Sequence, residues 1–302
     1  MTTIGVVGLG AMGGRIAGRL LAQGHLVYGT NRTRAKAETL IAQGLLWCDT
    51  PWTTAQCADV VISMVTDRDA LDTVTQGPDG ILAGLRPGSI YIDMSTVSPH
   101  TSRTLAQRVA SAGAAMLSAP VSGSVHAVEK GTLTIIAGGP VDAFDHVKPI
   151  LRQLGRTVTY VGDTGHALLL KLAINISLAV QMLAFSEGVL LAEQGGIDQT
   201  VALQVMTNSA IGSPMLKARA ALLRELPDNA WFDVAMMQKD LRLALDHGRG
   251  EGVPMPATTV ADQMLSTTRA AGYEHRDIAV VFRMLSDMVT APPPRTLDSA
   301  AA

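Results

Sequence analysis

The first half of the chain alternates short apolar runs with longer amphipathic stretches. Helical periodicity separates the apolar runs, for example over 15–23 and 33–43. Such alternation predicts a parallel sheet with helices on both faces. The runs expected to form strands are 4–9, 26–30, 60–65, 89–94, 114–119, 132–138 and 156–162, the last of which we expect to close the domain.

The strand pattern ends near Gly165, and only helical periodicity follows. Glycine and proline pairs separate the helical segments, as at Gly195-Gly196 and between Gly252 and Pro256. The predicted fold class is therefore α/β, a Rossmann-type doubly wound sheet followed by an all-helical C-terminal domain. The segments expected to be helical are 167–194, 198–208, 231–248, 257–271 and 275–289.

These patterns predict three parts of the chain. Residues 1–162 are expected to form the Rossmann-type domain, and residues 163–290 an all-helical domain that begins with a long interdomain helix. The tail 291–302, APPPRTLDSAAA, is rich in proline and small residues, so we expect it to be disordered.

Composition narrows the class of protein. The chain has 302 residues, 47% hydrophobic and 17% charged, with a net charge of −2, and these values fit a globular protein without the basic surface of a nucleic-acid binder. Its two cysteines, Cys48 and Cys57, do not form a C-x-x-C pair, so neither a disulfide framework nor a zinc site is expected. The first residues lack the features of a signal peptide. We therefore expect a cytoplasmic protein without a metal.

Residues 167–192 are apolar enough to resemble a membrane span. Four polar side chains, those of Lys171, Asn175, Gln181 and Glu187, interrupt the run at intervals that a bilayer would penalise. The pattern therefore favours a buried helix between domains.

The chain opens with IGVVGLGAMGGRIAGRL, in which Gly8, Gly10 and Gly13 form G-x-G-x-x-G between a strand pattern and a helix pattern. This context is typical of the dinucleotide-binding fingerprint, whose glycines permit the tight turn, the approach of the pyrophosphate and close helix–strand packing. The alternative is a glycine-rich turn without a ligand. The other residues that we expect to contact the cofactor from this loop and from the end of a later strand are Leu9, Ala11, Met12, Met64, Val65 and Thr66.

The second predicted strand ends in Asn31-Arg32-Thr33, where NAD-binding folds usually carry Asp or Glu. A carboxylate would repel a 2′-phosphate, whereas Arg32 can pair with it and its neighbours can hydrogen-bond nearby. These residues favour NADP(H) over NAD(H). The alternative is a solvent-facing arginine at the start of a helix.

Three further segments carry candidate chemistry. Ser95 and Thr96 in DMSTVSP follow a strand, at the edge where doubly wound sheets bind ligands. The Ser122-Gly123-Ser124 turn offers amides that could hold a carboxylate. Lys171 and Asn175 share one face of the apolar helix, one turn apart. Desolvation disfavours the ammonium form of a lysine in such a helix, which favours proton exchange.

Together these segments resemble the β-hydroxyacid dehydrogenases, a family that includes 3-hydroxyisobutyrate dehydrogenase, tartronate semialdehyde reductase and glyoxylate/succinic semialdehyde reductases. The resemblance covers nearly the whole chain. The matching motifs, in order, are GLGAMG, DMSTVSP, APVSG…GTL, the K-x-x-x-N pair and QKDLRLALD at 238–246.

The resemblance implies an oxidoreductase that interconverts a small β-hydroxyacid and its semialdehyde or keto form. It implies that Lys171 exchanges the hydroxyl proton, that Asn175 positions the substrate, and that Ser122 and Gly123 hold its carboxylate. It also implies that Thr96 lies between substrate and cofactor and that Lys239 lies near the nicotinamide. Residues 1–162 are then the NADP-binding domain, and residues 163–290 the domain for substrate binding and dimerisation. The 167–192 helix is apolar beyond one face, which predicts a homodimer, and the resemblance implies the same. Structural alternatives remain: Lys171 could extend from a core helix to solvent, and Lys239 could lie on an exposed helix.

The chain departs from the family pattern at three positions. Ser124 and His126 stand where the family usually has small residues, and His166 stands in a segment that is usually G-x-G. These side chains could reshape the substrate pocket. They leave the substrate open more than the reaction class.

Two other functions fit parts of the pattern. An imine reductase would share the fold and NADPH, but such enzymes typically carry Asp or Tyr in place of Lys171 and lack the carboxylate-binding turn. A binding module without turnover, like the chromatin-associated relatives, would have replaced the lysine or gained accessory domains.

Overall fold

The computed structural model describes residues 2–290, so the predicted disordered tail lies outside the described residues. The described chain divides into two compact units, one of Met1–Asn175 with Asp240–Val253 and one of Ile176–Lys239 with the segment from Pro254 onward. Helix α9 (Thr164–Gln194) and helix α12 (Val234–Gly250) each contribute to both units. The boundary predicted at 162/163 falls just before α9, whereas this division falls within it.

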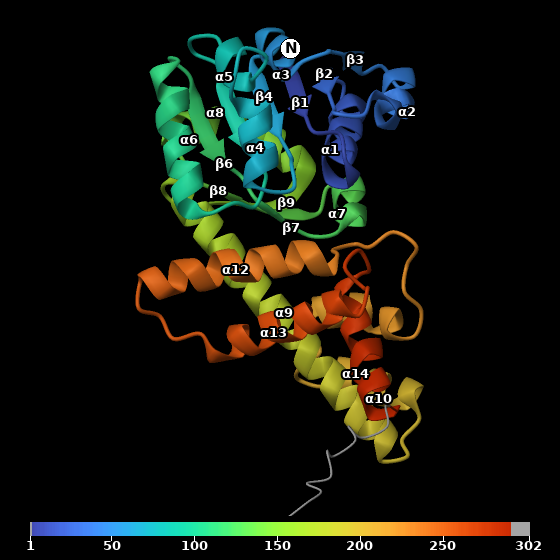
Figure 1. Cartoon of the computed structure of the whole chain (residues 1–302). Helices are drawn as coiled ribbons and strands as arrows, with labels where there is room; N and C mark the ends of the chain where they lie inside the picture. Colours follow the sequence, from blue (N-terminus) through green and yellow to red (C-terminus); the bar gives the residue numbers. More distant parts are fainter. Residues whose placement is uncertain (1, 291–302) are drawn as a thin grey trace, which may run out of the picture. The chain divides into compact units, whose positions relative to one another are not determined.

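The first unit is built on a six-stranded parallel sheet in the order β3-β2-β1-β4-β5-β6 (Figure 1). The order reverses beside β1, which is the switch point of a doubly wound sheet. The predicted Rossmann-type topology is therefore confirmed. The strands are β1 (Thr3–Val7), β2 (Leu26–Thr30), β3 (Leu46–Trp47), β4 (Val60–Ser63), β5 (Ile90–Asp93) and β6 (Ala115–Ser118).

The last two predicted strands do not extend the parallel sheet. Instead, β8 (Leu133–Ala137) and β9 (Gly155–Tyr160) form a second sheet with β7 (Val121–Ser122), which pairs antiparallel to β8. The chain reverses through α7 (Val125–Lys130), so β8 runs antiparallel to β7. An antiparallel bridge between Ser118 and Gly138 joins the ends of β6 and β8. The two-residue strands β3 and β7 were not predicted, because they are too short to show periodicity.

Helices cover both faces of the six-stranded sheet, as the buried apolar strands require. Helix α1 (Ala11–Ala22) buries Gly13, Ile16, Ala17 and Leu20 at helical spacing, and Ile16 and Leu20 belong to the same apolar cluster as the strand residues Ile4 and Val6. A second cluster, which includes Val61 and Tyr91, fills the other face. The remaining helices of this unit are η1 (Arg34–Ala37), α2 (Glu38–Ala42), α3 (Pro51–Gln56), α4 (Arg68–Thr75), α5 (Ile81–Gly84), α6 (Pro99–Ser111) and α8 (Val141–Leu154).

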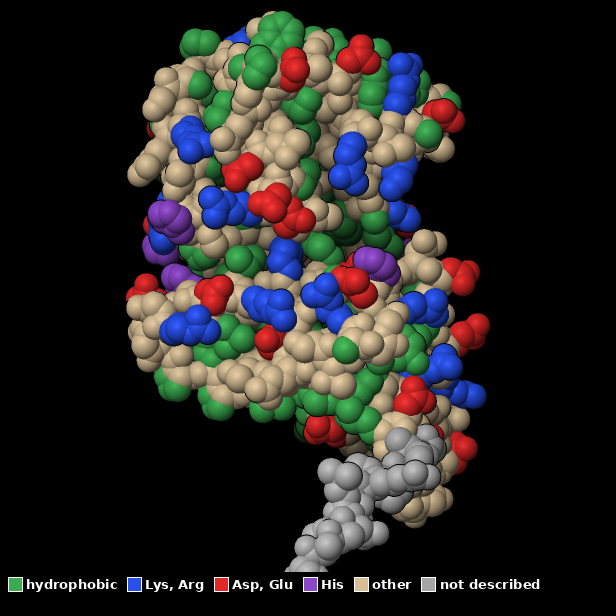
Figure 2. Space-filling view, in the orientation of Figure 1, with side chains coloured by type: hydrophobic (Ala, Val, Ile, Leu, Met, Phe, Trp, Pro, Cys, Tyr) green, Lys and Arg blue, Asp and Glu red, His purple; other side chains and the backbone are tan. Residues whose placement is uncertain are grey.

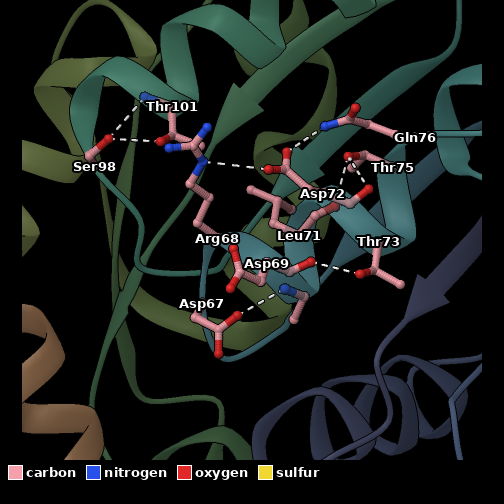
Figure 3. Close-up of polar contacts among 11 residues, drawn as sticks. Asp67, Arg68, Asp69, Leu71, Asp72, Thr73, Thr75, Gln76, Ser98 and Thr101 are labelled. Atoms are coloured by element: carbon pink, nitrogen blue, oxygen red, sulfur yellow. Dashed lines mark hydrogen bonds and ion pairs between the residues drawn. The ribbon is translucent and has the colours of Figure 1, made fainter.

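The helices that follow β4 and β5 both begin with a side-chain cap (Figure 3). Asp67 Oδ1 accepts the amide of Ala70 at 2.8 Å, and Ser98 Oγ accepts the amide of Thr101 at 3.0 Å. These caps satisfy amides of the first helical turn, which otherwise have no partner. They fix the ends of two loops that lie at the carboxyl edge of the sheet.

The second unit is helical, as predicted. The structure assigns it no strand among the described residues, apart from a single bridge between Asp233 and Asp277. The Asp277 carboxylate is fully buried and accepts the amides of Trp231 and Phe232, at 3.0 and 3.1 Å, which fixes the segment leading into α12. The helices besides α9 and α12 are α10 (Gln199–Asn208), α11 (Pro214–Arg219), η2 (Ala220–Leu223), α13 (Pro256–Ala270), η3 (Ile278–Val280) and α14 (Val281–Thr290).

Helix α9 is, among the described helices, the one long and apolar enough to cross a membrane. The core helix of a soluble protein can have the same length and composition. Only 33% of its most apolar stretch is buried, and Leu169, Leu170 and Leu191 are exposed. On the face shown in Figure 2, basic and acidic side chains are interspersed over both units.

Candidate active site

The glycine loop between β1 and α1 has the geometry that a pyrophosphate requires. Gly8 has a φ of +92°, and a Cβ there would lie 2.5 Å from the Met64 carbonyl oxygen. A Cβ on Gly13 would lie 1.9 Å from the Gly8 carbonyl oxygen, so this glycine permits the close contact of helix and loop. A Cβ on Gly10 would meet nothing within 4 Å. The space over Gly10, at the N-terminus of a 12-residue helix, therefore fits a phosphate group.

Asn31 ties the end of β2 to this loop. Its Oδ1 accepts the amide of Leu9 at 3.1 Å, and its Nδ2 donates to the Thr33 carbonyl at 3.0 Å. Asn31 therefore shapes the loop itself, a role that the sequence analysis did not assign to it. Arg32 and Thr33 are exposed beside it.

The loops after β4 and β5 are joined at the same edge of the sheet. The Val65 amide donates to Ser95 Oγ at 3.0 Å, and Ser95 is fully buried. Thr96 and Met64 are half-buried, and Thr66 is exposed. Thus the structure brings Val65 and Ser95 into contact, with Met64 beside Gly8.

The predicted carboxylate turn lies between β7 and α7. Gly123 has a φ of +139°, and a Cβ there would approach Leu133 Cδ2 to 2.8 Å and Ala127 Cβ to 2.9 Å, so a side chain is excluded by both backbone and space. Ser122 and Ser124 are half-buried on either side. The turn is thus a glycine-specific bend that leaves two hydroxyl side chains partly accessible.

Helix α7 is fastened to the cofactor helix α1. Arg15 Nε lies 2.9 Å from Glu129 Oε1, and an Arg19 guanidinium nitrogen donates to the Glu129 carbonyl at 2.8 Å. Two histidines depart from the family pattern, and each lies beside a carboxylate. His126 Nδ1 lies 3.5 Å from Glu129 Oε2, and the His126 side chain is exposed. His166 Nε2 lies 3.7 Å from Asp163 Oδ2. Both histidines are thus engaged with surface carboxylates.

The buried stripe of α9 carries the candidate proton-transfer group. Lys171 Nζ donates to Asn175 Oδ1 at 3.0 Å, and Asn175 Nδ2 donates to Asp240 Oδ2 at 2.5 Å. Asn175 and Asp240 are 1% and 2% exposed, whereas Lys171 is half-buried. Asn175 therefore holds an ammonium group at its oxygen and a carboxylate at its nitrogen. Lys171 lies at the edge of the buried stripe with its head group held.

Asp240 was not predicted as a site residue, although it lies within the motif at 238–246. Its burial could have been predicted, because Asp240 shares the helical spacing of the buried residues Met237, Leu241 and Ala244. An acidic residue on a buried helix face needs a partner. Lys239, the predicted neighbour of the nicotinamide, is half-buried and belongs to the second unit, so its proximity to the cofactor stays a prediction.

The other predicted site residues all lie in the first unit, on the fingerprint loop, the ends of β2, β4 and β5, the β7–α7 turn and α9. Among residues 2–290, no group of three or more His, Cys, Asp and Glu side chains is placed to hold a metal ion.

Comparison with known proteins agrees with this architecture. The family model of the NAD-binding domain of 6-phosphogluconate dehydrogenase matches residues 3–162. A second family model, described as NAD-binding of NADP-dependent 3-hydroxyisobutyrate dehydrogenase, matches residues 165–285. The two matches together span nearly all of the described chain.

Individual relatives match over nearly the whole chain. The 2-(hydroxymethyl)glutarate dehydrogenase of Eubacterium barkeri is 32% identical over 94% of this chain and 95% of its own length. The cytokine-like nuclear factor N-PAC of Xenopus tropicalis is also 32% identical, but the chain spans only 52% of it. The crystal structure of 3-hydroxyisobutyrate dehydrogenase from Salmonella typhimurium superposes with a TM-score of 0.87 at 27% identity, covering 94% of this chain and all of that one.

An imine reductase from Myxococcus stipitatus shares the fold, with a TM-score of 0.63 at 18% identity over 94% of this chain and 99% of that one. One family model covers the fingerprint loop, the other covers the helical half that carries Lys171, and the full-length relative spans both. The chain therefore belongs to the 3-hydroxyisobutyrate dehydrogenase, or β-hydroxyacid dehydrogenase, family of NAD(P)-dependent oxidoreductases that act on CH–OH groups.

Proposed function

We propose that this protein interconverts a small β-hydroxyacid and its semialdehyde or keto form with NADP(H), and that Lys171 is the general acid and base. The observation that carries the proposal is the hydrogen-bonded series Lys171–Asn175–Asp240. It presents a half-buried ammonium group that is hydrogen-bonded to a buried amide. Such a group is suited to deliver a proton to a carbonyl oxygen and to take it back.

Several features of this chain fit a dinucleotide. The space over Gly10 accommodates the pyrophosphate, and the N-terminus of α1 favours its negative charge. Arg32, exposed at the end of β2, favours a 2′-phosphate over a free hydroxyl, which supports NADP(H) as the preferred cofactor. The description of the matching 3-hydroxyisobutyrate dehydrogenase model as NADP-dependent points the same way.

The chain's own residues then have separate tasks in the reaction. A bound nicotinamide supplies or accepts the hydride. In reduction, Lys171 stabilises the negative charge that develops on the carbonyl oxygen and protonates it; in oxidation it removes the hydroxyl proton. Asn175 holds Lys171 and helps to position the substrate, and Asp240 orients Asn175. The half-buried lysine is partly screened from water, which strengthens its interaction with that charge.

The relatives' names indicate the substrate class. Both 3-hydroxyisobutyrate and 2-(hydroxymethyl)glutarate carry a hydroxymethyl group on the carbon next to a carboxylate. We propose a substrate of that type, whose carboxylate is held at the Ser122-Gly123 turn with Ser124, Ser95 and Thr96 nearby. The hydroxyl groups of Ser122 and Ser124, which are half-buried on either side of the Gly123 bend, are placed to donate to such a carboxylate.

Turnover on a panel tests the proposal. Small semialdehydes and β-hydroxyacids, each with NADPH or NADH and NADP or NAD, are compared with cyclic imines of similar size. We expect activity on carboxylate-bearing substrates and none on imines. Activity confined to imines would contradict the proposal and favour an imine reductase, and tight NADPH binding without turnover of any compound would favour a binding module.

We also propose that the protein is a homodimer that uses the apolar surface of α9. Leu169 and Leu170 are 41% and 46% exposed, and Leu191 is 76% exposed on the same helix. Exposed leucines on a helix that already buries one stripe favour association with a partner.

A further inference from the structure

A buried series of hydrogen bonds lies beneath the loops that follow β4 and β5. Its members are Ser63, Tyr91, Asp93 and Ser95, and each has 0% exposed surface. Ser63 and Asp93 are the last residues of neighbouring strands and face each other in register. Buried polar side chains need hydrogen-bond partners, and each member of this series has at least one.

The direction of each hydrogen bond follows from the number of protons. Ser63 Oγ donates to Asp93 Oδ1 at 2.7 Å, and the Ser63 and Tyr91 hydroxyl oxygens are also 2.7 Å apart. Because a hydroxyl has one proton, Tyr91 must donate to Ser63. Burial, and then the charge of Asp93, raises the pKa of Tyr91 well above its usual range, so the phenol stays a donor.

The series ends at the two loops. The Ser95 amide donates to Asp93 Oδ1 at 3.1 Å, and Ser95 Oγ accepts the Val65 amide at 3.0 Å. Asp93 therefore fixes the backbone of Ser95, and Ser95 fixes the backbone of Val65. These two hydrogen bonds connect the loop after β5, which carries Thr96, to the loop after β4, which carries Thr66.

The strand order indicates which part of a dinucleotide would lie on these loops. A dinucleotide crosses the carboxyl edge of a doubly wound sheet at the switch point, one half on each side. Asn31-Arg32-Thr33 mark the β2 side of β1 as that of the adenosine half, so the nicotinamide half belongs on the side of β4 and β5.

We propose that Asp93 and Ser63 are positioning residues for the nicotinamide half of the cofactor, acting through Ser95 and Val65. This inference rests on the proposed cofactor binding, not on the identity of the substrate. The bonds hold the two loops in the arrangement that the nicotinamide requires, so its binding does not have to order them. The adenosine half, on the other side of β1, is independent of them.

Binding of whole and truncated nucleotides tests the proposal without catalysis. Wild type, Ser63→Ala and Asp93→Asn are titrated with NADPH and with 2′-phospho-ADP-ribose, which lacks the nicotinamide. If the wild-type protein binds NADH more tightly than NADPH, NADH and ADP-ribose are used in place of NADPH and 2′-phospho-ADP-ribose. We expect NADPH affinity to fall by about 3- to 10-fold in both variants, the size of one net hydrogen bond, and affinity for the truncated nucleotide to change by less than about 2-fold.

Ser102→Ala is the matched control, because it breaks another buried hydroxyl pair in the same unit. Ser102 Oγ and Ser118 Oγ are 2.5 Å apart, and both residues are fully buried. We expect Ser102→Ala to lower thermal stability without changing NADPH affinity relative to affinity for the truncated nucleotide. If Asp93→Asn does not fold, Ser63→Ala decides the matter by itself.

The proposal would be overturned if Ser63→Ala weakened the binding of NADPH and of the truncated nucleotide equally, or left NADPH affinity unchanged. It would also be overturned if Ser102→Ala weakened NADPH binding alone, as Ser63→Ala is expected to do. Wild-type turnover is measured separately. A wild type that binds NADPH but converts no hydroxyacid or semialdehyde would contradict the proposed function and leave the binding result to decide the role of Asp93 and Ser63.

Discussion

Asn175 Nδ2 donates a hydrogen bond to Asp240 Oδ2 at 2.5 Å, although the two residues are 65 positions apart in the chain. The bond fixes the orientation of the amide. If the amide rotated by half a turn, its oxygen would face the carboxylate and its NH₂ group would face the Lys171 ammonium, and both contacts would be repulsive. Asp240 therefore determines that an oxygen faces Lys171 Nζ, 3.0 Å away.

Loss of the lysine should abolish most of the chemistry. Lys171→Ala should lower kcat by roughly 10²–10⁴, as removal of a general acid and base does. NADPH affinity should stay near the wild-type value, because the fingerprint loop and Arg32 hold the cofactor elsewhere. Turnover and fluorescence titration measure the two effects. Near-normal turnover of the best carboxylate substrate by this variant would rule out the assigned role.

Asp240 should matter through Asn175. Asp240→Ala should lower kcat and raise KM, with kcat/KM reduced about 10- to 100-fold, because a charge-assisted hydrogen bond contributes roughly 1.5–3 kcal/mol. The double variant with Asn175→Ala should be little worse than Asn175→Ala, since the two residues act as a unit.

The control for Asp240 is Asp246→Ala on the same helix. Asp246 is exposed and pairs with Arg249 at 3.1 Å, so its loss should leave both kinetic constants unchanged. Additive losses in the Asn175/Asp240 double variant would show that the two side chains act separately.

Two glycines of the fingerprint should respond differently to the same substitution. Gly10→Ala should fold normally and lose most of its dinucleotide affinity, because the added methyl group meets no protein atom within 4 Å and fills the space for the pyrophosphate. Gly13→Ala should destabilise the fold by about 1–3 kcal/mol, because its Cβ would lie 1.9 Å from the Gly8 oxygen. Thermal melts with and without NADPH separate the two results. A stable Gly10→Ala protein that still binds NADPH tightly would contradict the assignment.

Cofactor preference should depend on Arg32. Arg32→Ala should weaken NADPH by about 1.5–3 kcal/mol, the contribution of a charge-assisted hydrogen bond, and should leave NADH nearly unchanged. Arg108→Ala serves as the control, because Arg108 is exposed in the last turn of α6, away from the carboxyl ends of the strands. Equal loss of the two cofactors in Arg32→Ala would contradict the preference for NADP(H).

The oligomeric state should depend on α9. Sedimentation at micromolar concentration should show a dimer, and Leu170→Glu should shift it toward the monomer by placing a charge on the exposed apolar surface. Ala22→Glu, an exposed position at the end of α1, is the control. A wild-type monomer under these conditions would contradict the proposed dimer.

Local sequence patterns were sufficient to predict the class of fold and the glycine loop that we assign to the cofactor. Hydrophobic periodicity is a local property, so it separated the strands of the first half from the helices of the second. The fingerprint is local as well: Gly8, Gly10 and Gly13 act within one loop, and their spacing alone indicated which needs a positive φ and which needs space.

The way in which distant residues combine depends on the tertiary structure. The structure placed β8 and β9 in a second sheet, because strand pairing depends on the path of the chain and not on each strand's own pattern. It brought Asp240 to Asn175, Asn31 to Leu9 and Ser95 to Val65. Each of these bonds joins residues far apart in the chain. A hydrogen bond forms only when the donor–acceptor distance is right to within a few tenths of an ångström, and sequence spacing fixes that distance only within one helix or turn. That is why the Lys171–Asn175 pair could be predicted from its helical spacing, and the carboxylate that orients it could not.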